Sequence, residues 1–204
     1  MQFTEQKKEL AILTVEKKTV LGIVGSPRKG GNTETLVDSV LAGASEYGAV
    51  PEKVILHDMN ISPCRACNSC QKTGKCIQQD DMDILVDLMH KCDVWVLGTP
   101  IYWWGPSAQF KAFVDRWYGL DQRLFQEKQI VLTVPMGGEN SNLARHTVGM
   151  MKEICNYLGM ELVETVIAAG MNGKNSVKEN RRILEDCRTA GLRVMRNILS
   201  RHRQ

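Results

Sequence analysis

Short apolar runs alternate along the chain with longer segments in which apolar residues recur at every third or fourth position. The short runs are typical of strands buried on both faces of a sheet, and the longer segments are typical of amphipathic helices. The predicted strands are residues 19–25, 54–57, 93–98, 129–134 and 161–169. The predicted helices are residues 32–47, 82–91, 106–118, 143–158 and 177–200.

This alternation predicts an α/β fold, because parallel strands need crossover connections that are usually helical. Five strands are too few for an eight-stranded barrel, so we expect a three-layer, doubly wound, five-stranded parallel sheet. Ligands of such sheets bind at the carboxyl ends of the strands. The predicted binding region is therefore formed by the loops that begin near Ser26, Met59, Thr99 and Pro135.

The size and composition of the chain indicate one domain without a membrane span. With 204 residues, 43% of them apolar, the chain can bury one sizeable core. The net charge of +3 requires neither a nucleic acid nor an anionic membrane as partner, and no apolar run approaches the roughly 18 residues of a span. Residues 10–13 are too short a run for a signal peptide, so we expect a cytoplasmic protein. Residues 1–18 are expected to be an N-terminal appendage to a domain at residues 19–204.

The loop between the first strand and the first helix, GSPRKGGNT at residues 25–33, has the features of a phosphate site. Ser26, Asn32 and Thr33 can donate hydrogen bonds. Arg28 adds positive charge, and two adjacent glycines allow backbone amides to approach a ligand closely. The P-loop and the GxGxxG dinucleotide patterns are both absent. A site for one terminal monophosphate remains, and the alternative is a glycine turn followed by a helix cap.

Aromatic residues follow the third strand, where a flat ligand at the carboxyl edge of the sheet would lie. Tyr102, Trp103 and Trp104 are placed to stack on such a ligand. Gly105 and Pro106 then end the strand and start a helix. The aromatic residues are thus left at the opening between the strand and the helix. The alternative is that Trp103 and Trp104 pack against a neighbouring helix or subunit.

Four of the seven cysteines are clustered in a predicted loop at residues 61–79. Cys64, Cys67, Cys70 and Cys76 have the spacing CxxCxxCx5C. A thiolate at every third residue can point into a curled loop, and CxxCxxC is typical of iron–sulfur ligation. Structural zinc usually uses two well-separated CxxC pairs, which this loop lacks. Three hypotheses remain for the loop: an iron–sulfur cluster, a zinc site, and free thiols or a redox disulfide.

The other polar and sulfur-bearing residues receive structural interpretations. Cys92, Cys155 and Cys187 have apolar neighbours and are predicted to be buried small hydrophobic residues. Asp80 and Asp81 stand where a helix begins and are predicted to act as its N-cap. The histidines show no spacing typical of a metal or acid–base site, and the arginine-rich last helix is predicted to expose a solvated face.

Three segments carry a resemblance to a known family: GSPRKGGNT after the first strand, PCRACNSCQKTGKCIQQDDM after the second and GTPIYWWGPSAQFKAFVDRW after the third. Together they resemble the NADPH-dependent FMN reductase family, and most closely its iron–sulfur flavoprotein branch, over residues 19–169. The resemblance implies a flavodoxin-like fold with strand order 2-1-3-4-5, bound FMN, and a homodimer or homotetramer with the flavin near a subunit interface.

The resemblance also implies which residues hold the cofactors. The residues implied to bind the FMN phosphate are Ser26, Arg28, Asn32 and Thr33. The residues implied to contact the flavin ring are Pro100, Ile101, Tyr102, Trp103, Trp104, Met136, Gly137 and Gly138. The implied ligands of a [4Fe–4S] cluster are Cys64, Cys67, Cys70 and Cys76.

We therefore expect an FMN-dependent electron-transfer oxidoreductase, an iron–sulfur flavoprotein that passes electrons between FMN and a [4Fe–4S] cluster. Its electron partner would be NAD(P)H or a ferredoxin-like protein, and no side chain is expected to act as an acid or a base. The alternatives are a cluster-free NAD(P)H-dependent FMN or quinone reductase, a pure electron carrier, and a zinc-stabilised binding module.

Overall fold

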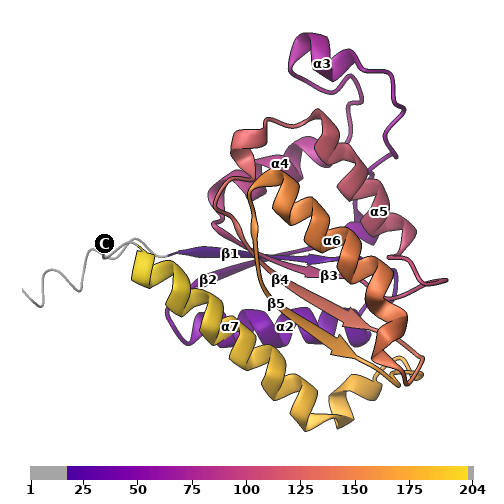
Figure 1. The fold of residues 1–204 in the computed structure, drawn as a ribbon, viewed down its shortest axis with the longest axis vertical. Helices are drawn as coiled ribbons and strands as arrows, with labels where there is room; N and C mark the ends of the chain where they lie inside the picture. The colour runs from indigo at the N-terminus through magenta and orange to yellow at the C-terminus, as the bar shows by residue number, and fades with distance from the viewer. Residues whose placement is uncertain (1–17, 202–204) are drawn as a thin grey trace, which may run out of the picture.

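The computed structural model describes residues 18–201, which form a five-stranded sheet covered by helices on both faces (Figure 1). Apart from Lys18, the predicted appendage lies outside the described residues. The strands are β1 (Thr19–Val24), β2 (Val50–Ile55), β3 (Val94–Gly98), β4 (Gln129–Pro135) and β5 (Glu161–Ala168). The α-helices are α2 (Asn32–Ser45), α3 (Ser69–Thr73), α4 (Met82–Lys91), α5 (Ala108–Asp115), α6 (Arg145–Leu158) and α7 (Arg181–Arg201).

All strand pairs of the sheet are parallel, and the order is β2-β1-β3-β4-β5. The prediction of a doubly wound, flavodoxin-like α/β sheet is confirmed. Val24 at the end of β1 lies beside Gly98 of β3, and Gly98 lies beside Thr133 of β4. The loops that follow β1, β3 and β4 therefore begin side by side at one edge of the sheet.

Two apolar cores lie on opposite faces of the sheet, because side chains alternate along each strand. Leu21 and Ile23 of β1 pack in the core with α4, α5 and α6. Val20 and Val24 of the same strand pack in the core with α2 and α7. Figure 1 shows these two helical layers above and below the sheet.

Helices α2 and α7 cross closely in the second of these layers, and two glycines make the approach possible. A Cβ atom added to Gly43 would lie 2.0 Å from the carbonyl oxygen of Arg188. A Cβ atom added to Gly191 would lie 2.1 Å from the carbonyl oxygen of Val40. Both positions therefore require glycine because the facing helix leaves no room for a side chain, and not because of their backbone angles.

Several predicted boundaries differ from the observed ones for identifiable reasons. β2 begins four residues earlier than the predicted strand, because it is an outer strand whose first four residues are exposed and form no apolar run. α5 begins at Ala108, since the Ser107 side chain caps it by accepting from the Phe110 amide. α5 also ends early, at a 3-10 helix, η2 (Arg116–Gly119). α7 begins at Arg181 because Asn180 Oδ1 accepts from the Ile183 amide.

The three cysteines outside the cluster are buried, as predicted from their apolar neighbours. Burial raises the pKa of Cys92 and Cys155 to about 11 and that of Cys187 to about 12. These thiols stay protonated at neutral pH and act as packing residues. Within residues 18–201, no helix is both long and apolar enough to cross a bilayer.

Candidate functional site

The loop after β1 leads into a helix whose first turn is open to an anion. Gly31 is the N-cap of α2 and provides no side-chain cap. Within the described chain, the amides of Asn32, Thr33 and Glu34 have no protein acceptor. Ser26 and Thr33 are almost fully buried beside them. Unpaired amides and the positive end of the helix dipole together favour a phosphate group here.

The side chain of Asn32 connects this loop to the segment that follows β5. Its Nδ2 donates to the carbonyl oxygen of Gly173 at 2.7 Å and to that of Met171 at 3.3 Å. Its Oδ1 accepts from the Val177 amide at 3.2 Å. Because the side chain is engaged within the protein, a phosphate contact from Asn32 would come from its main-chain amide.

A hollow of about 230 Å³ brings most of the sequence-predicted cofactor residues together. Arg28 and Lys174 line it, and neither forms an ion pair with any described residue. Neighbouring Lys29, by contrast, pairs with Asp58 at 2.8 Å. The other lining residues are Ser26, Asn32, Thr33, Pro100, Ile101, Tyr102, Pro135, Met136, Gly137, Met171 and Asn172. Two cationic side chains that no described acidic residue pairs with therefore line the hollow.

A second hollow, of about 190 Å³, adjoins the first and contains the remaining predicted ring contacts. Trp103, Trp104 and Gly138 line this second hollow. The residues that line both hollows are Ile101, Met136 and Gly137. The structure therefore places the predicted phosphate loop and the predicted ring loops around one connected region at the carboxyl edge of the sheet.

The two tryptophans form the tip of a tight hairpin with unusual backbone geometry. Tyr102 and Gly105 exchange both main-chain hydrogen bonds, at 2.9 and 3.1 Å. Trp103 and Trp104 between them have φ angles of +50° and +64°. Two positive φ angles match a type I′ turn, in which Asn and Gly are favoured and bulky residues are strained. The Trp103 side chain is 90% exposed, so packing within the chain does not explain its presence there.

We expect the double substitution Trp103→Asn with Trp104→Gly to stabilise the fold by about 1–2 kcal/mol, because Asn and Gly adopt left-handed backbone angles readily. The same change should slow reduction of bound flavin by NADPH, because two rings at the mouth of the site are lost. Urea unfolding measures the first effect and stopped-flow absorbance the second. The control Trp103→Phe with Trp104→Phe retains both rings and the strain, so its stability should match the wild type. A less stable Asn-Gly variant would contradict the assignment of strain.

The cysteine loop docks on η2. The Tyr118 hydroxyl donates to Asn68 Oδ1 at 3.2 Å, and Gln71 Nε2 donates to the Tyr118 carbonyl at 3.3 Å. A Cβ atom on Gly119 would lie 3.4 Å from Cys70 Sγ. All four cysteines of the loop line one small hollow, together with Arg116, Tyr118 and Gly119. The short helix α3 inside this loop was not predicted from the sequence.

Within residues 18–201, no three His, Cys, Asp or Glu side chains are grouped in a way that could hold a metal ion. Cys64 and Cys67 are exposed, and Cys70 and Cys76 are half-buried. Hydrogen bonds from Ser69 lower the pKa of the Cys67 thiol. The four thiols thus share a hollow without converging on one point.

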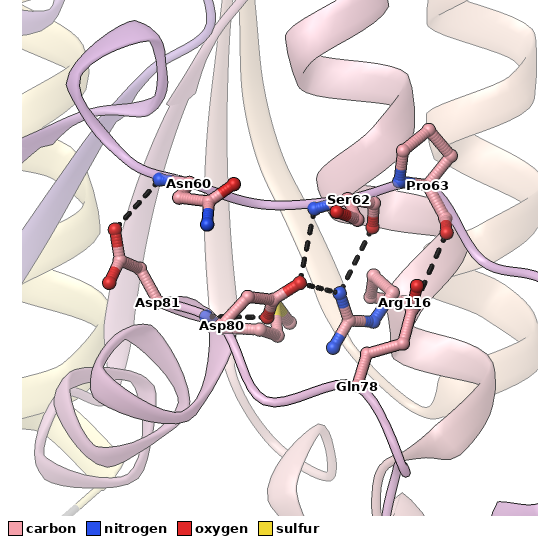
Figure 2. A network of polar contacts seen from close by, with 8 residues as sticks. Asn60, Ser62, Pro63, Gln78, Asp80, Asp81 and Arg116 are labelled. Atoms are coloured by element: carbon pink, nitrogen blue, oxygen red, sulfur yellow. Dashed lines mark hydrogen bonds and ion pairs between the residues drawn. The ribbon is translucent and has the colours of Figure 1, made fainter.

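Both ends of the cysteine loop are fastened to the start of α4 by acidic residues (Figure 2). Asp80 accepts from the Met82 amide at 3.1 Å, as an N-cap would, and from the Ser62 amide at 3.1 Å. Asp81 stands at the N-cap position of α4, as predicted, but its side chain does not cap the helix and accepts instead from the Asn60 amide at 2.7 Å. Asp80 also forms a buried ion pair with Arg116 at 2.5 Å. Burial would raise the pKa of Asp80, but its hydrogen bonds with Arg116 and Ser62 hold that pKa below its usual value.

Sequence reasoning missed two groups of residues at these sites. Met171, Asn172 and Lys174 line the first hollow because they follow β5, whose loop was not among those predicted to bind. The rule that ligands bind at the carboxyl ends of strands applies equally to this loop. Arg116 was also missed, and no local pattern marks its pairing with Asp80 across 36 positions.

Known proteins are similar to this chain in sequence or in fold. An iron–sulfur flavoprotein of Methanocaldococcus jannaschii is 34% identical over 153 residues, which is 75% of this chain and 76% of that protein. An iron–sulfur flavoprotein of Methanosarcina thermophila is 31% identical over 145 residues, 71% of this chain and 76% of that protein. The structure of an NAD(P)H:quinone oxidoreductase from Methanothermobacter marburgensis superposes with a TM-score of 0.69 at 18% identity, covering 88% of this chain and 98% of that chain. At that identity the likeness concerns the fold alone.

The family model for NADPH-dependent FMN reductase matches residues 19–173. The matched region contains the predicted phosphate loop, the cysteine loop, the tryptophan hairpin and the first five residues after β5. It ends before α7. The chain belongs to the NADPH-dependent FMN reductase family.

Proposed function

We propose that this FMN-dependent oxidoreductase passes electrons between its flavin and a [4Fe–4S] cluster bound by Cys64, Cys67, Cys70 and Cys76. The observation that carries the proposal is the shared hollow of the four cysteines, which is also lined by Arg116, a buried residue whose Nη2 has no hydrogen-bond partner among the described residues. The names of the two archaeal relatives support the proposal.

The residues around the two hollows fit FMN. Its phosphate would bind at the start of α2, with Ser26 and Thr33 at hand and Arg28 and Lys174 supplying charge. Its ring would lie between residues 100–104 and residues 136–138. When bound, FMN supplies hydride acceptance from a nicotinamide and single-electron exchange. The protein holds the ring at the carboxyl edge of the sheet, and no side chain is assigned an acid–base role.

The cysteine loop fits a cluster in its donor set and in its backbone. Ala66 and Asn68, which stand between successive cysteines, have φ angles of +51° and +57°, so the loop curls instead of running straight. The Ala66 amide donates to Cys64 Sγ at 3.4 Å. Hydrogen bonds of this kind to sulfur are typical of iron–sulfur sites. Because the thiols do not converge, cluster binding would draw the exposed Cys64 and Cys67 inward.

Anaerobic purification followed by assays of iron, acid-labile sulfide and FMN tests the proposal. We expect about four irons and one FMN per chain, as a [4Fe–4S] site and one flavin site require. In the variant Cys70→Ser the iron should be lost while FMN remains. The variant Cys155→Ala, which changes a buried cysteine outside the loop, should retain both. Iron-free wild-type protein, even after reconstitution with iron and sulfide, would overturn the cluster.

The second candidate function is a cluster-free NAD(P)H-dependent FMN or quinone reductase. The absence of converging thiols among the described residues favours it. This function predicts rapid bleaching of the flavin by NAD(P)H in iron-free protein. The cluster function predicts in addition that the reduced protein exchanges electrons quickly with a ferredoxin-like partner.

We also propose a homodimer or homotetramer. Trp103 is 90% exposed at the mouth of the predicted flavin site, and a partner subunit would cover it. Light scattering of the FMN-loaded protein measures the mass directly, and a monomer would contradict this proposal.

A further inference from the structure

Arg116 is a buried arginine with only part of its hydrogen-bonding capacity in use. It lies at the junction of α5 and η2, and its side chain is 2% exposed. Nη1 donates to Asp80 Oδ2 at 2.5 Å and to the Ser62 carbonyl at 3.0 Å. Nη2 has no hydrogen-bond partner within residues 18–201. Figure 2 shows the contacts of Nη1 with Asp80 and Ser62 as dashed lines and draws none from Nη2.

The unpartnered nitrogen belongs to a side chain that lines the cysteine hollow. The same hollow is lined by all four clustered cysteines, with Tyr118 and Gly119. Burial would lower the pKa of Arg116, but Asp80 and, more weakly, the neighbouring Cys76 raise it, so the guanidinium stays charged. A buried charged donor left without an acceptor is unfavourable, which indicates that something in the hollow accepts from it.

We propose that Arg116 Nη2 donates a hydrogen bond to a sulfur of the cluster site, the Cys76 thiolate or a cluster sulfide beside it, and thereby raises the reduction potential of the cluster. This inference rests on the proposed cluster. Asp80 and the Ser62 carbonyl hold Nη1 in place, which leaves Nη2 available for a sulfur in the hollow that Arg116 lines.

The sign of the effect follows from charge. Reduction adds one negative charge to the cluster, and a hydrogen bond from a cation stabilises the more negative state more strongly. Loss of the bond should therefore make reduction harder. A hydrogen bond to a charged group typically changes an equilibrium constant about tenfold or more. For a one-electron reduction, a tenfold change corresponds to a shift of about 59 mV in the reduction potential.

The test is the variant Arg116→Lys, purified anaerobically with its cluster and FMN. Lysine retains a positive charge for Asp80 but cannot donate with the forked geometry of a guanidinium. The cluster potential is read by dithionite titration followed by electron paramagnetic resonance, and iron release to a chelator is timed in parallel. The matched control is Arg123→Lys, an exposed arginine in the next segment that pairs with Asp121. The variant Asp80→Asn removes the ion pair while leaving Nη2 in place.

We expect Arg116→Lys to lower the ratio of reduced to oxidised cluster about tenfold at a fixed potential and to release iron faster, with FMN content unchanged. Arg123→Lys should match the wild type, and Asp80→Asn should retain its iron. An Arg116→Lys protein with wild-type potential and iron release overturns the inference. So does equal iron loss in Arg116→Lys and Asp80→Asn, because Arg116 would then act only through its ion pair. If Arg116→Lys alone assembles no cluster, the inference is supported. Wild-type protein without iron instead overturns the proposed cluster itself, and this inference with it.

Discussion

The substitution Gly191→Ala is expected to destabilise the protein by about 2–3 kcal/mol, although alanine is the better helix former. A Cβ atom at this position would lie 2.1 Å from the Val40 carbonyl oxygen and 2.7 Å from the Ala44 amide nitrogen. These are backbone atoms of α2, so no side chain can rotate away, and α2 and α7 must move apart. Urea unfolding followed by circular dichroism measures the change.

A matched control is available in another helix of the same chain. Gly149 lies in α6, and, apart from its chain neighbours and the adjoining backbone of its own helix, no described atom lies within 4 Å of a Cβ added there. Gly149→Ala should therefore stabilise the protein by about 0.5–1 kcal/mol, as expected for an open helical site. If both variants were stabilised alike, the close crossing of α2 and α7 would not be a constraint on the fold.

The substitution Arg28→Gln is expected to weaken FMN binding by about 10- to 100-fold, the usual range for one hydrogen bond to a charged group. Arg28 lines the hollow at the start of α2 and has no ion-pair partner among the described residues. Riboflavin lacks the phosphate, so its affinity should not change. Titration of apoprotein with each flavin, followed by quenching of flavin fluorescence, gives both dissociation constants.

Lys29→Gln is the control for Arg28→Gln. It removes the same charge one residue further along, but Lys29 pairs with Asp58 and does not line the hollow. Its FMN affinity should remain within about threefold of the wild type at physiological salt, where exposed charges are screened. Equal losses in the two variants, or a parallel loss of riboflavin binding, would show that Arg28 does not hold the phosphate.

The strands that are buried on both faces could be predicted from the sequence. β1, β3 and β4 are covered on both faces and appear in the sequence as continuous apolar runs. β2 was predicted only in part, because Pro51, Glu52 and Lys53 lie in the exposed half of an outer strand. An apolar pattern arises where a strand is buried. An outer strand with exposed faces has few buried residues and therefore only a weak apolar pattern.

The parts of the candidate site that could be predicted are those whose residues lie close together in one loop. The phosphate loop and the cysteine spacing are short motifs whose residues stand together in sequence as well as in space. Lys174 and Arg116 reach the same sites from distant segments, by contacts that the topology creates. The role of the Asn32 side chain is likewise visible only once the segment after β5 is folded against it.

Helix α5 connects the two sites along one rigid element. At one end Ser107 caps the helix and its hydroxyl donates to the Gly25 carbonyl, beside the predicted phosphate loop. At the other end Arg116 meets Asp80 and the cysteine hollow. One residue inserted in this helix would turn everything beyond it by about 100° and swing the guanidinium away from the sulfurs. The eight residues of α5 thus set both the distance and the rotation between its two ends.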